Sequence, residues 1–352
     1  MQIPVFFHPE QLAFKPRYEW AFGERIDHPE TTARAESILR AVQADPGVYG
    51  LRLPEPVGND VLRLCHSVAL LTVYDVASSL PDGEDHYPTV FPRDPDAVAD
   101  PTNLRHAGAW CFDAGTPLSA RTSVAARWSA ACAWDAAGVV LRGEAPAAYA
   151  LSRPPGHHAS QNQFGGYCYV NNGALAAHRL RAAGMRVLVL DIDFHHGDGT
   201  QSLFWNDPQV LTVSIHGDPN ACFPYHAGYE GERGGPQGGG ANLNVPLPMG
   251  TEGAAWLDAF HSRVRPFVDS FSPDALVLAA GIDAYRLDPV GHFGLTTEDF
   301  ERIGFAVGSL GLPTVAVQEG GYHTAHLGTN VDALLRGLRD GLAAGRVVFV
   351  AG

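Results

Sequence analysis

Five short apolar segments of this chain end abruptly at glycine, proline or a charged residue, and this pattern limits the folds that the chain can adopt. The segments cover residues 147–151, 187–190, 211–215, 275–280 and 314–317. Buried strands of a parallel sheet have this form because helices cover both of their faces. We therefore predict that the five segments are strands of one central sheet and that each strand ends in a loop with polar residues.

Segments with helical spacing and many alanines lie between these strands, at about 123–141, 172–183, 253–270, 297–310 and 328–343. Alternating strands and helices indicate an α/β protein with a mostly parallel sheet between two layers of helices, a three-layer α/β/α fold. No repeat or linker-like composition divides the chain, so we expect one domain over residues 1–352 with a proline-rich insertion loop at about 82–117. Ligands of such folds bind at the carboxyl ends of the strands.

The composition narrows the class of protein. No apolar run approaches the ~20 residues of a membrane span, and the N-terminus lacks a signal-type segment, so we expect a soluble cytoplasmic protein without a membrane partner. A formal charge of −14 disfavours nucleic acid and favours neutral or cationic small molecules. The five cysteines form no Cys-x-x-Cys pair, which indicates reduced thiols. Sixteen histidines, several of them paired or beside aspartate, make metal or acid–base chemistry the leading interpretation.

A candidate metal site follows the strand at 187–190. Asp193 and His195 are two residues apart, and in extended backbone such side chains point to the same side. Asp283, after the strand at 275–280, offers a third ligand. One histidine and two carboxylates leave open positions on a divalent metal; zinc fits, and other divalent metals fit too. A lone Asp-x-His is more often a turn cap and a core histidine, but the polar pairs around this one favour a metal.

Two adjacent histidines, His157 and His158, follow a stiff Pro-Pro-Gly turn. Asp191 and Asp198 flank the metal segment, so we predict the pairs His157–Asp191 and His158–Asp198. A carboxylate on one ring nitrogen fixes the tautomer and raises the basicity of the other nitrogen. Such pairs beside a metal suit activation of water and protonation of a leaving amine, although paired histidines in loops are often only turn formers.

Three aromatic residues in loops complete the candidate site. Tyr322 follows two glycines that let its loop lie close to a ligand, and its phenol could polarise a carbonyl opposite the metal or merely cap the turn. Tyr167 and Phe223 lie beside glycine or proline and could flank a narrow tube for an alkyl chain. Taken alone, each of these two is more typical of a core position.

The order of these motifs resembles the histone deacetylase superfamily. The matching motifs are Pro154-Pro155-Gly156-His157-His158, Gly165-Gly166-Tyr167-Cys168-Tyr169-Val170-Asn171-Asn172, Asp191-Ile192-Asp193-Phe194-His195-His196-Gly197-Asp198-Gly199-Thr200-Gln201, Gly281-Ile282-Asp283, Asp288-Pro289 and Glu319-Gly320-Gly321-Tyr322. The likeness is strong from residue 147 to the C-terminus and looser before it. Within the superfamily the chain is most similar to bacterial acetylpolyamine amidohydrolases, in its length, its Phe-Gly-Gly-Tyr-Cys segment and its insertion.

The resemblance implies an arginase/deacetylase-like fold and a role for each motif. Zinc, with Fe²⁺ or Co²⁺ as alternatives, would be held by Asp193, His195 and Asp283. The general base and acid would be His157 and His158 with Asp191 and Asp198, and Tyr322 would polarise the carbonyl. Gly166, Tyr167 and Phe223 would line the acyl channel, and structural potassium would bind Asp191, Ser214, Ile215 and the backbone of Asp193 and His195. Asp198 is a departure, because several acetylpolyamine members carry asparagine there.

The resemblance also implies a substrate and an assembly. The leading reaction is removal of acetyl groups from acetylated amines such as acetylputrescine or acetylspermidine, with metal- and histidine-activated water as the nucleophile. A homodimer is expected, with the insertion narrowing the entrance. Acidic residues of the early loops are hypothesised to bind the distal ammonium group: Glu19, Glu24, Asp27, Glu84 and Asp85.

Three other functions stay open. The first is a histone-type protein acetyl-lysine deacetylase. The second is an arginase-like dimanganese ureohydrolase, which the several aspartates at strand ends suit superficially, but a dinuclear site has no use for the Pro-Pro-Gly-His-His turn or the Gly-Gly-Tyr loop. The third is a non-catalytic sensor of acetylated ligands, which the intact set of residues disfavours.

Overall fold

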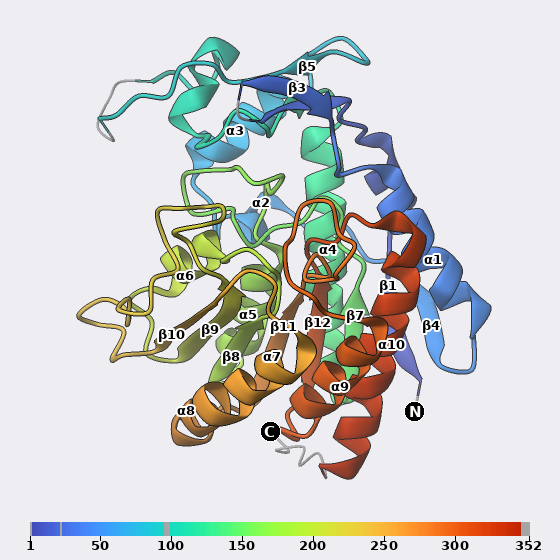
Figure 1. Ribbon diagram of the computed structural model, residues 1–352. Helices are drawn as coiled ribbons and strands as arrows, with labels where there is room; N and C mark the ends of the chain where they lie inside the picture. The colour runs from blue at the N-terminus through green and yellow to red at the C-terminus, as the bar shows by residue number, and fades with distance from the viewer. Residues whose placement is uncertain (1, 22, 95–98, 346–352) are drawn as a thin grey trace.

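The computed structural model describes residues 2–21, 23–94 and 99–345. Its centre is an eight-stranded sheet with the order β10-β9-β8-β11-β12-β7-β1-β4, in which every neighbouring pair is parallel (Figure 1). The strands are β1 (Ile3–Phe6), β4 (Tyr49–Arg52), β7 (Ala147–Ala150), β8 (Val187–Asp191), β9 (Val210–Gly217), β10 (Asn242–Leu247), β11 (Ala275–Ala280) and β12 (Thr314–Gln318). The predicted α/β class is confirmed, and this sheet is parallel throughout.

The five predicted strands are all present and form the contiguous middle of the sheet, β9-β8-β11-β12-β7. The prediction missed β1, β4 and β10. Their sequences, Ile-Pro-Val-Phe, Tyr-Gly-Leu-Arg and Asn-Leu-Asn-Val-Pro-Leu, are interrupted by proline, glycine or asparagine. Two of them, β4 and β10, are edge strands, where covering on both faces is not required and proline is tolerated.

Helices cover both faces of the sheet (Figure 1). One layer holds α1 (Thr32–Ala44), α7 (Gly253–Ala259), η3 (Phe260–Val264), α8 (Arg265–Phe271), α9 (Thr297–Gly308) and α10 (Thr324–Ala344); the other holds α2 (Asn59–Leu62), α3 (Val68–Ala77), α4 (Thr122–Leu141), α5 (Asn172–Ala182) and α6 (Asp198–Phe204). The single helix expected over 253–270 contains a π-helical turn, η3, just before Pro266, whose ring does not fit a regular helix interior.

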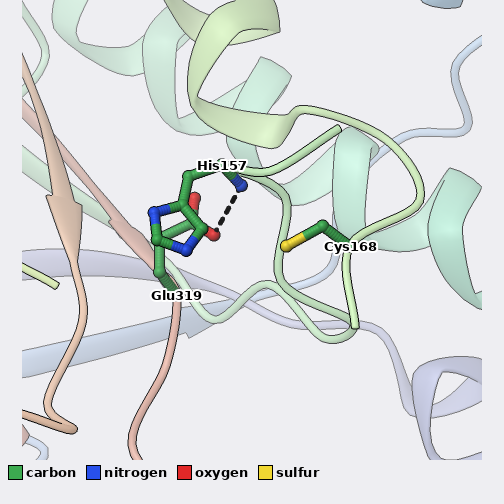
Figure 2. Close-up of side chains that lie close together, drawn as sticks. All are labelled: His157, Cys168 and Glu319. Atoms are coloured by element: carbon green, nitrogen blue, oxygen red, sulfur yellow. Dashed lines mark hydrogen bonds between the residues drawn. The ribbon is translucent and has the colours of Figure 1, made fainter. Parts of the chain in front are cut away.

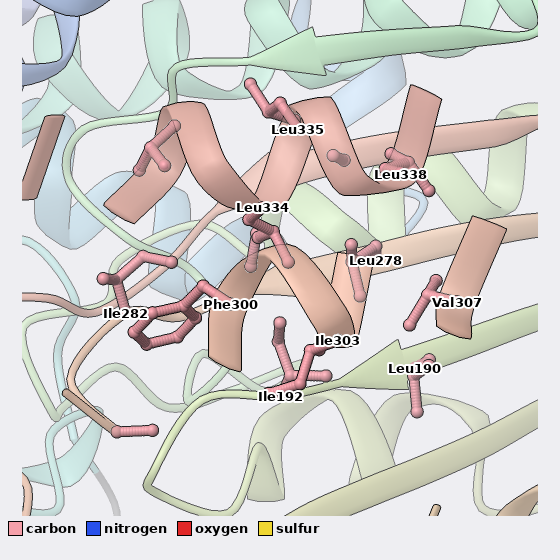
Figure 3. Close-up of a cluster of buried hydrophobic side chains, with 14 of the residues drawn as sticks. Leu190, Ile192, Leu278, Ile282, Phe300, Ile303, Val307, Leu334, Leu335 and Leu338 are labelled. Carbon is pink, nitrogen blue, oxygen red and sulfur yellow. The ribbon is translucent and has the colours of Figure 1, made fainter. Parts of the chain in front are cut away.

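Alternate residues of each central strand enter different cores. In β8, Leu188 and Leu190 face one core, and Val187 and Val189 face the other. Figure 3 shows Leu190 of β8 and Leu278 of β11 beneath the apolar faces of α9 and α10. Apolar burial on both faces therefore fixes the central strands, and with them the loops at their carboxyl ends.

The proline-rich segment 82–117 contains regular structure. It includes β5 (Asp85–His86), which pairs antiparallel with β6 (Leu118–Ser119), and the 3₁₀ helix η2 (Leu104–Ala109); residues 95–98 lie outside the described part. The antiparallel hairpin β2 (Tyr18–Ala21) and β3 (Glu24–Asp27) follows η1 (Pro9–Ala13). The rings of Tyr18 and Tyr87 stack at 4.7 Å, and both segments lie above the carboxyl ends of the central strands (Figure 1).

None of the described helices is long and apolar enough to cross a bilayer.

Candidate active site

The polar residues predicted from the strand ends meet at one place. The loops after β7, β8, β11 and β12 carry most of them, and these four strands are neighbours in the sheet. The carboxyl ends of parallel strands share one edge, so the loops converge there. The predicted metal ligands, both histidines, Asp191 and Tyr322 are buried, which puts their chemistry in a pocket of low polarity.

Asp193, His195 and Asp283 form the centre of this pocket. Nδ1 of His195 lies 2.9 Å from an Asp283 oxygen and 3.3 Å from an Asp193 oxygen, and one ligand atom from each residue fits within 4.8 Å. The backbone N–H of Phe194 donates to Asp283 at 2.8 Å, and that of Gly320 donates to Asp193 at 2.8 Å. The carboxylates are thus held by the backbone, and one oxygen of each lies close to the His195 nitrogen.

The charges at this centre are suited to a divalent cation. Burial and the Asp193 charge raise the pKa of Asp283 to about 7, whereas His157 and His195 lower the pKa of Asp193 against the effect of burial. Burial opposes a charge on His195, but its two carboxylate partners raise its pKa to about 9. Two buried carboxylates therefore draw positive charge to this point, and one nitrogen with two oxygens is a donor set that zinc accepts.

Glycine at position 320 is required by this centre. A Cβ atom there would lie 2.6 Å from a carboxylate oxygen of Asp193 and 2.6 Å from one of Asp283. Side chains do not approach so closely, so any larger residue would displace the carboxylates. The Gly-Gly-Tyr loop can lie against the candidate metal ligands only because its first residue has no side chain.

Both predicted histidine–aspartate contacts are present. Nδ1 of His157 donates to Asp191 at 2.9 Å, and Nδ1 of His158 donates to Asp198 at 2.6 Å. Burial opposes a charge on His157, but the carboxylates of Asp191 and Asp193 raise its pKa well above the ordinary value. Burial and the neighbouring His157 lower the pKa of His158 to about 4. The two ring centroids are only 4.1 Å apart, yet the site favours the protonated form of His157 and the neutral form of His158.

Glu319 positions the histidine turn. Its carboxylate accepts hydrogen bonds from the backbone N–H of Gly156 at 2.6 Å and of His157 at 3.0 Å, and the Cys168 sulfur lies beside the pair (Figure 2). Burial keeps the pKa of the Cys168 thiol well above its ordinary value and raises that of Glu319 to about 7. A protonated thiol is a poor metal ligand, so we assign this cluster a structural role.

Tyr322 is held from two sides. Its backbone N–H donates to Asp288 at 2.6 Å, and the Arg34 guanidinium lies over its ring. Burial raises the pKa of the phenol well above its ordinary value, so the hydroxyl keeps its proton. A buried phenol O–H near Asp193 and Asp283 can donate a hydrogen bond to a substrate oxygen.

Tyr167 and Phe223 are partly exposed beside these groups, as expected for walls of an opening. Tyr167 packs edge-on against Tyr322 with 5.7 Å between ring centroids, and Phe223 packs against His158 at 5.0 Å. Gly166 has φ +55°, and a Cβ there would lie 2.3 Å from the His158 ring. Sequence reasoning missed Phe112, which stacks on Phe223 with 5.8 Å between ring centroids.

Of the early acidic residues, Glu19 reaches the pocket wall. The buried Glu19 accepts a hydrogen bond from the Tyr167 hydroxyl at 2.7 Å, and burial raises its pKa. Asp85 is paired with Arg17 at 3.2 Å. The others, Glu24, Asp27 and Glu84, are exposed.

The residues predicted to bind potassium lie behind the candidate metal centre. Asp191 and Ser214 are paired in register on β8 and β9, and both border a cavity of about 10 Å³. Such a cavity holds one water molecule or ion. His196 also borders it, and neither of its ring nitrogens has a hydrogen-bond partner among the described residues, whereas Ile215 is not part of the cavity lining.

Sequence reasoning missed a buried ionic network that supports the loops. Glu30 pairs with Arg34 at 2.9 Å and with Arg153 at 2.9 Å, and all three side chains are nearly inaccessible. Arg153 donates to the carbonyls of Gln11 and Phe14 in the N-terminal segment. Arg153 directly precedes the Pro-Pro-Gly-His-His motif, but nothing in the sequence indicates that it pairs with Glu30.

Comparisons with known proteins agree with this geometry. A family model described as histone deacetylase domain matches residues 28–338. The acetylpolyamine amidohydrolase of Burkholderia pseudomallei is 40% identical over 95% of this chain and 98% of that protein. The acetylpolyamine amidohydrolase of Mycoplana ramosa is 34% identical over 95% of this chain and 99% of that protein. A crystal structure of acetylpolyamine aminohydrolase from Burkholderia pseudomallei matches with TM-score 0.89 and 39% identity over 98% of this chain and 99% of that one. A crystal structure of the HDA15 HD domain matches with TM-score 0.79 and 27% identity, over 97% of this chain and 95% of that one. The chain therefore belongs to the histone deacetylase family.

Proposed function

We propose that this chain is a zinc-dependent amidohydrolase that removes acetyl groups from small acetylated amines, in the first place acetylpolyamines. The observation that carries the proposal is the convergence of Asp193, His195 and Asp283 with two histidine–aspartate pairs and a buried phenol. The substrate class is supported by relatives named acetylpolyamine amidohydrolase that align over nearly their whole length.

The residues of the pocket divide the work of amide hydrolysis. A bound zinc ion supplies Lewis acidity for the carbonyl and lowers the pKa of water. His157 and His158 each commit Nδ1 to a carboxylate, so Nε2 is left to accept the proton of the attacking water or to give one to the leaving amine. Tyr322 donates its O–H to the oxygen on which negative charge develops.

Glu19 is the proposed site for the distal ammonium group of the substrate. It is a buried carboxylate at the pocket wall, and its hydroxyl partner, Tyr167, carries no charge. A cation that replaces bulk water beside such a carboxylate gains a charge-assisted hydrogen bond. A neutral amine or a peptide N–H could donate to this carboxylate but would not neutralise its charge.

Two further proposals concern ions and assembly. We propose potassium at Asp191, Ser214 and Ile215, supported by the ion-sized cavity beside the first two residues.

We propose a homodimer formed through the hairpin β2–β3 and the 82–117 segment, which expose the apolar side chains of Trp20, Ile26 and Val90. Sedimentation analysis would test the dimer, and a Trp20→Ser, Val90→Ser double variant should be monomeric.

The dimanganese alternative is disfavoured by contacts in the pocket, and the protein deacetylase alternative by the shorter alignment with such a relative. A dimanganese site would need Asp198 and Asp288, but Asp198 is bound to His158, and Asp288 accepts from the backbone N–H of Tyr322 and Val290. Histone deacetylase 8 of Arabidopsis thaliana is 40% identical but aligns with only 54% of this chain. A protein deacetylase therefore stays the second candidate.

Steady-state kinetics test the proposal directly. The zinc-loaded enzyme is assayed with acetylputrescine, acetylspermidine and an acetyl-lysine peptide, and metal content is measured per chain. We expect one zinc ion and a higher kcat/KM for the small amines. A preference for the peptide would support the histone-type alternative, and two divalent metal ions per chain would support the ureohydrolase.

A further inference from the structure

His226 contacts Asp198, the carboxylate that orients His158. Nε2 of His226 lies 3.4 Å from Oδ2 of Asp198, and Oδ1 of the same carboxylate accepts from His158 at 2.6 Å. The other ring nitrogen of His226, Nδ1, lies 2.8 Å from the Pro224 carbonyl oxygen. Asp198 therefore stands between two imidazoles, one buried and one near the surface.

Both ring nitrogens of His226 face acceptors, and this favours the doubly protonated ring. A carbonyl oxygen and a carboxylate can only accept, so each needs a hydrogen from the ring. Only the doubly protonated imidazolium supplies both hydrogens at once. The contact with Asp198 raises the pKa of His226 above its ordinary value, against the effect of partial burial.

His226 also stands between solvent and the catalytic pair. Its side chain is 58% exposed and borders an open groove with a volume of about 520 Å³, whose lining includes His158, Asp198 and Glu232. The Phe112 ring covers another side of His226 at 5.9 Å and stacks on Phe223. Among the described residues, the ionisable side chains around His226 are Asp198 on α6, Glu232 in the loop before β10 and His158 in the same groove.

We propose that His226 is a positioning residue for amide hydrolysis: as a cation it clamps Asp198 against His158 and ties that pair to the Phe223–Pro224 turn of the channel wall. This inference rests on the proposed function and deepens it. When His226 loses a proton, it must release either Asp198 or the turn. The clamp therefore weakens as pH rises through the pKa of His226.

Kinetics across pH test the clamp. His226→Gln keeps a donor for Asp198 without a titrating group, and His226→Phe removes the donor. We expect the phenylalanine variant to lose about two- to five-fold in kcat with little change in KM, the range of a half-exposed ion pair. The glutamine variant should recover most of this loss and lack the alkaline change of the wild-type profile. His261→Gln, an exposed histidine on η3, is the matched control and should follow wild type.

A measurement without turnover separates this inference from the proposed function. In protein with ¹⁵N-labelled histidine, NMR should show His226 doubly protonated at neutral pH, and Asp198→Asn should lower its pKa. Two results together would overturn the clamp, even if the protein hydrolyses amides. The first is an ordinary His226 pKa that Asp198→Asn leaves unchanged, and the second is that wild type and His226→Gln have superimposable pH profiles of kcat. A titration as expected in a protein that hydrolyses no acetylated amine rejects the proposed function alone.

Discussion

The guanidinium of Arg34 lies over the ring of Tyr322, with 4.6 Å between Cζ and the ring centroid. Arg34 is itself fixed, because it donates to the Gly321 carbonyl and pairs with Glu30 at 2.9 Å. The ring is thus held by a buried cation and by packing against Tyr167. The phenol hydroxyl is not needed for this arrangement, so it can be removed without loss of the loop.

Tyr322→Phe should therefore separate chemistry from binding. We expect kcat to fall roughly 100- to 1000-fold, the cost of losing one donor to a developing oxyanion, with KM and the melting temperature nearly unchanged. Steady-state kinetics and thermal denaturation measure these quantities. Unchanged turnover would mean that Tyr322 does not polarise the substrate carbonyl.

Asp193→Ala should remove the metal and the activity together. The variant loses one of three ligands and leaves His195 and Asp283 without their shared partner. Metal content, activity and the stabilisation produced by added zinc should all be lost. Asp218→Ala, which alters an aspartate after β9 that caps a turn, is the matched control and should retain one metal per chain. An Asp193→Ala protein with full zinc and activity would move the metal site elsewhere.

The parts of the site that the sequence predicted depend on local signals. The central strands are continuous apolar runs, and Asp193, Asp283 and Tyr322 follow them directly, so their meeting was determined by the parallel order of the strands. Both histidine–aspartate pairs followed from the same geometry.

The parts that the sequence did not predict depend on contacts between distant segments. Glu19 meets Tyr167 across 148 residues, and Arg34 contacts the Gly321 carbonyl across 287. Phe112 stacks on Phe223 from the end of the insertion. No local periodicity or spacing encodes such contacts, because they arise only when β2, α1 and the end of the insertion fold against the loops at the strand ends.

Gly166→Ala should disturb His158. The backbone at Gly166 has φ +55°, and the added Cβ would lie 2.3 Å from the His158 ring. We expect a loss of at least ten-fold in kcat and about 1 kcal/mol or more of stability. Gly184→Ala is the matched control, because it has φ +85° but nothing within 4 Å of the added Cβ. It should share the backbone cost and keep its activity, and equal kinetics of the two variants would contradict the steric argument.

His66 should make the fold sensitive to acid. Its Nδ1 donates to the Ser160 carbonyl at 2.8 Å, and its Nε2 accepts from the Asn171 N–H at 2.9 Å, so the buried ring must be neutral. Burial lowers its pKa to about 4, against about 6.5 in an unfolded chain. Between these values the unfolded state binds a proton that the native state does not, so the free energy of unfolding falls as pH decreases from 6.5 to 4, by about 3 kcal/mol in total.

His66→Gln isolates this contribution. A glutamine amide can donate to Ser160 and accept from Asn171 without titrating. Urea denaturation of the metal-free protein at pH 7.5, 6 and 5, in excess chelator, gives the free energy of unfolding without a contribution from metal release. We expect the difference between wild type and variant to shift by about 1.4 kcal/mol per pH unit below 6, in favour of the variant. His261→Gln should show no such shift. Parallel curves for wild type and His66→Gln would mean that the His66 ring accepts a proton in the folded protein as easily as in the unfolded chain.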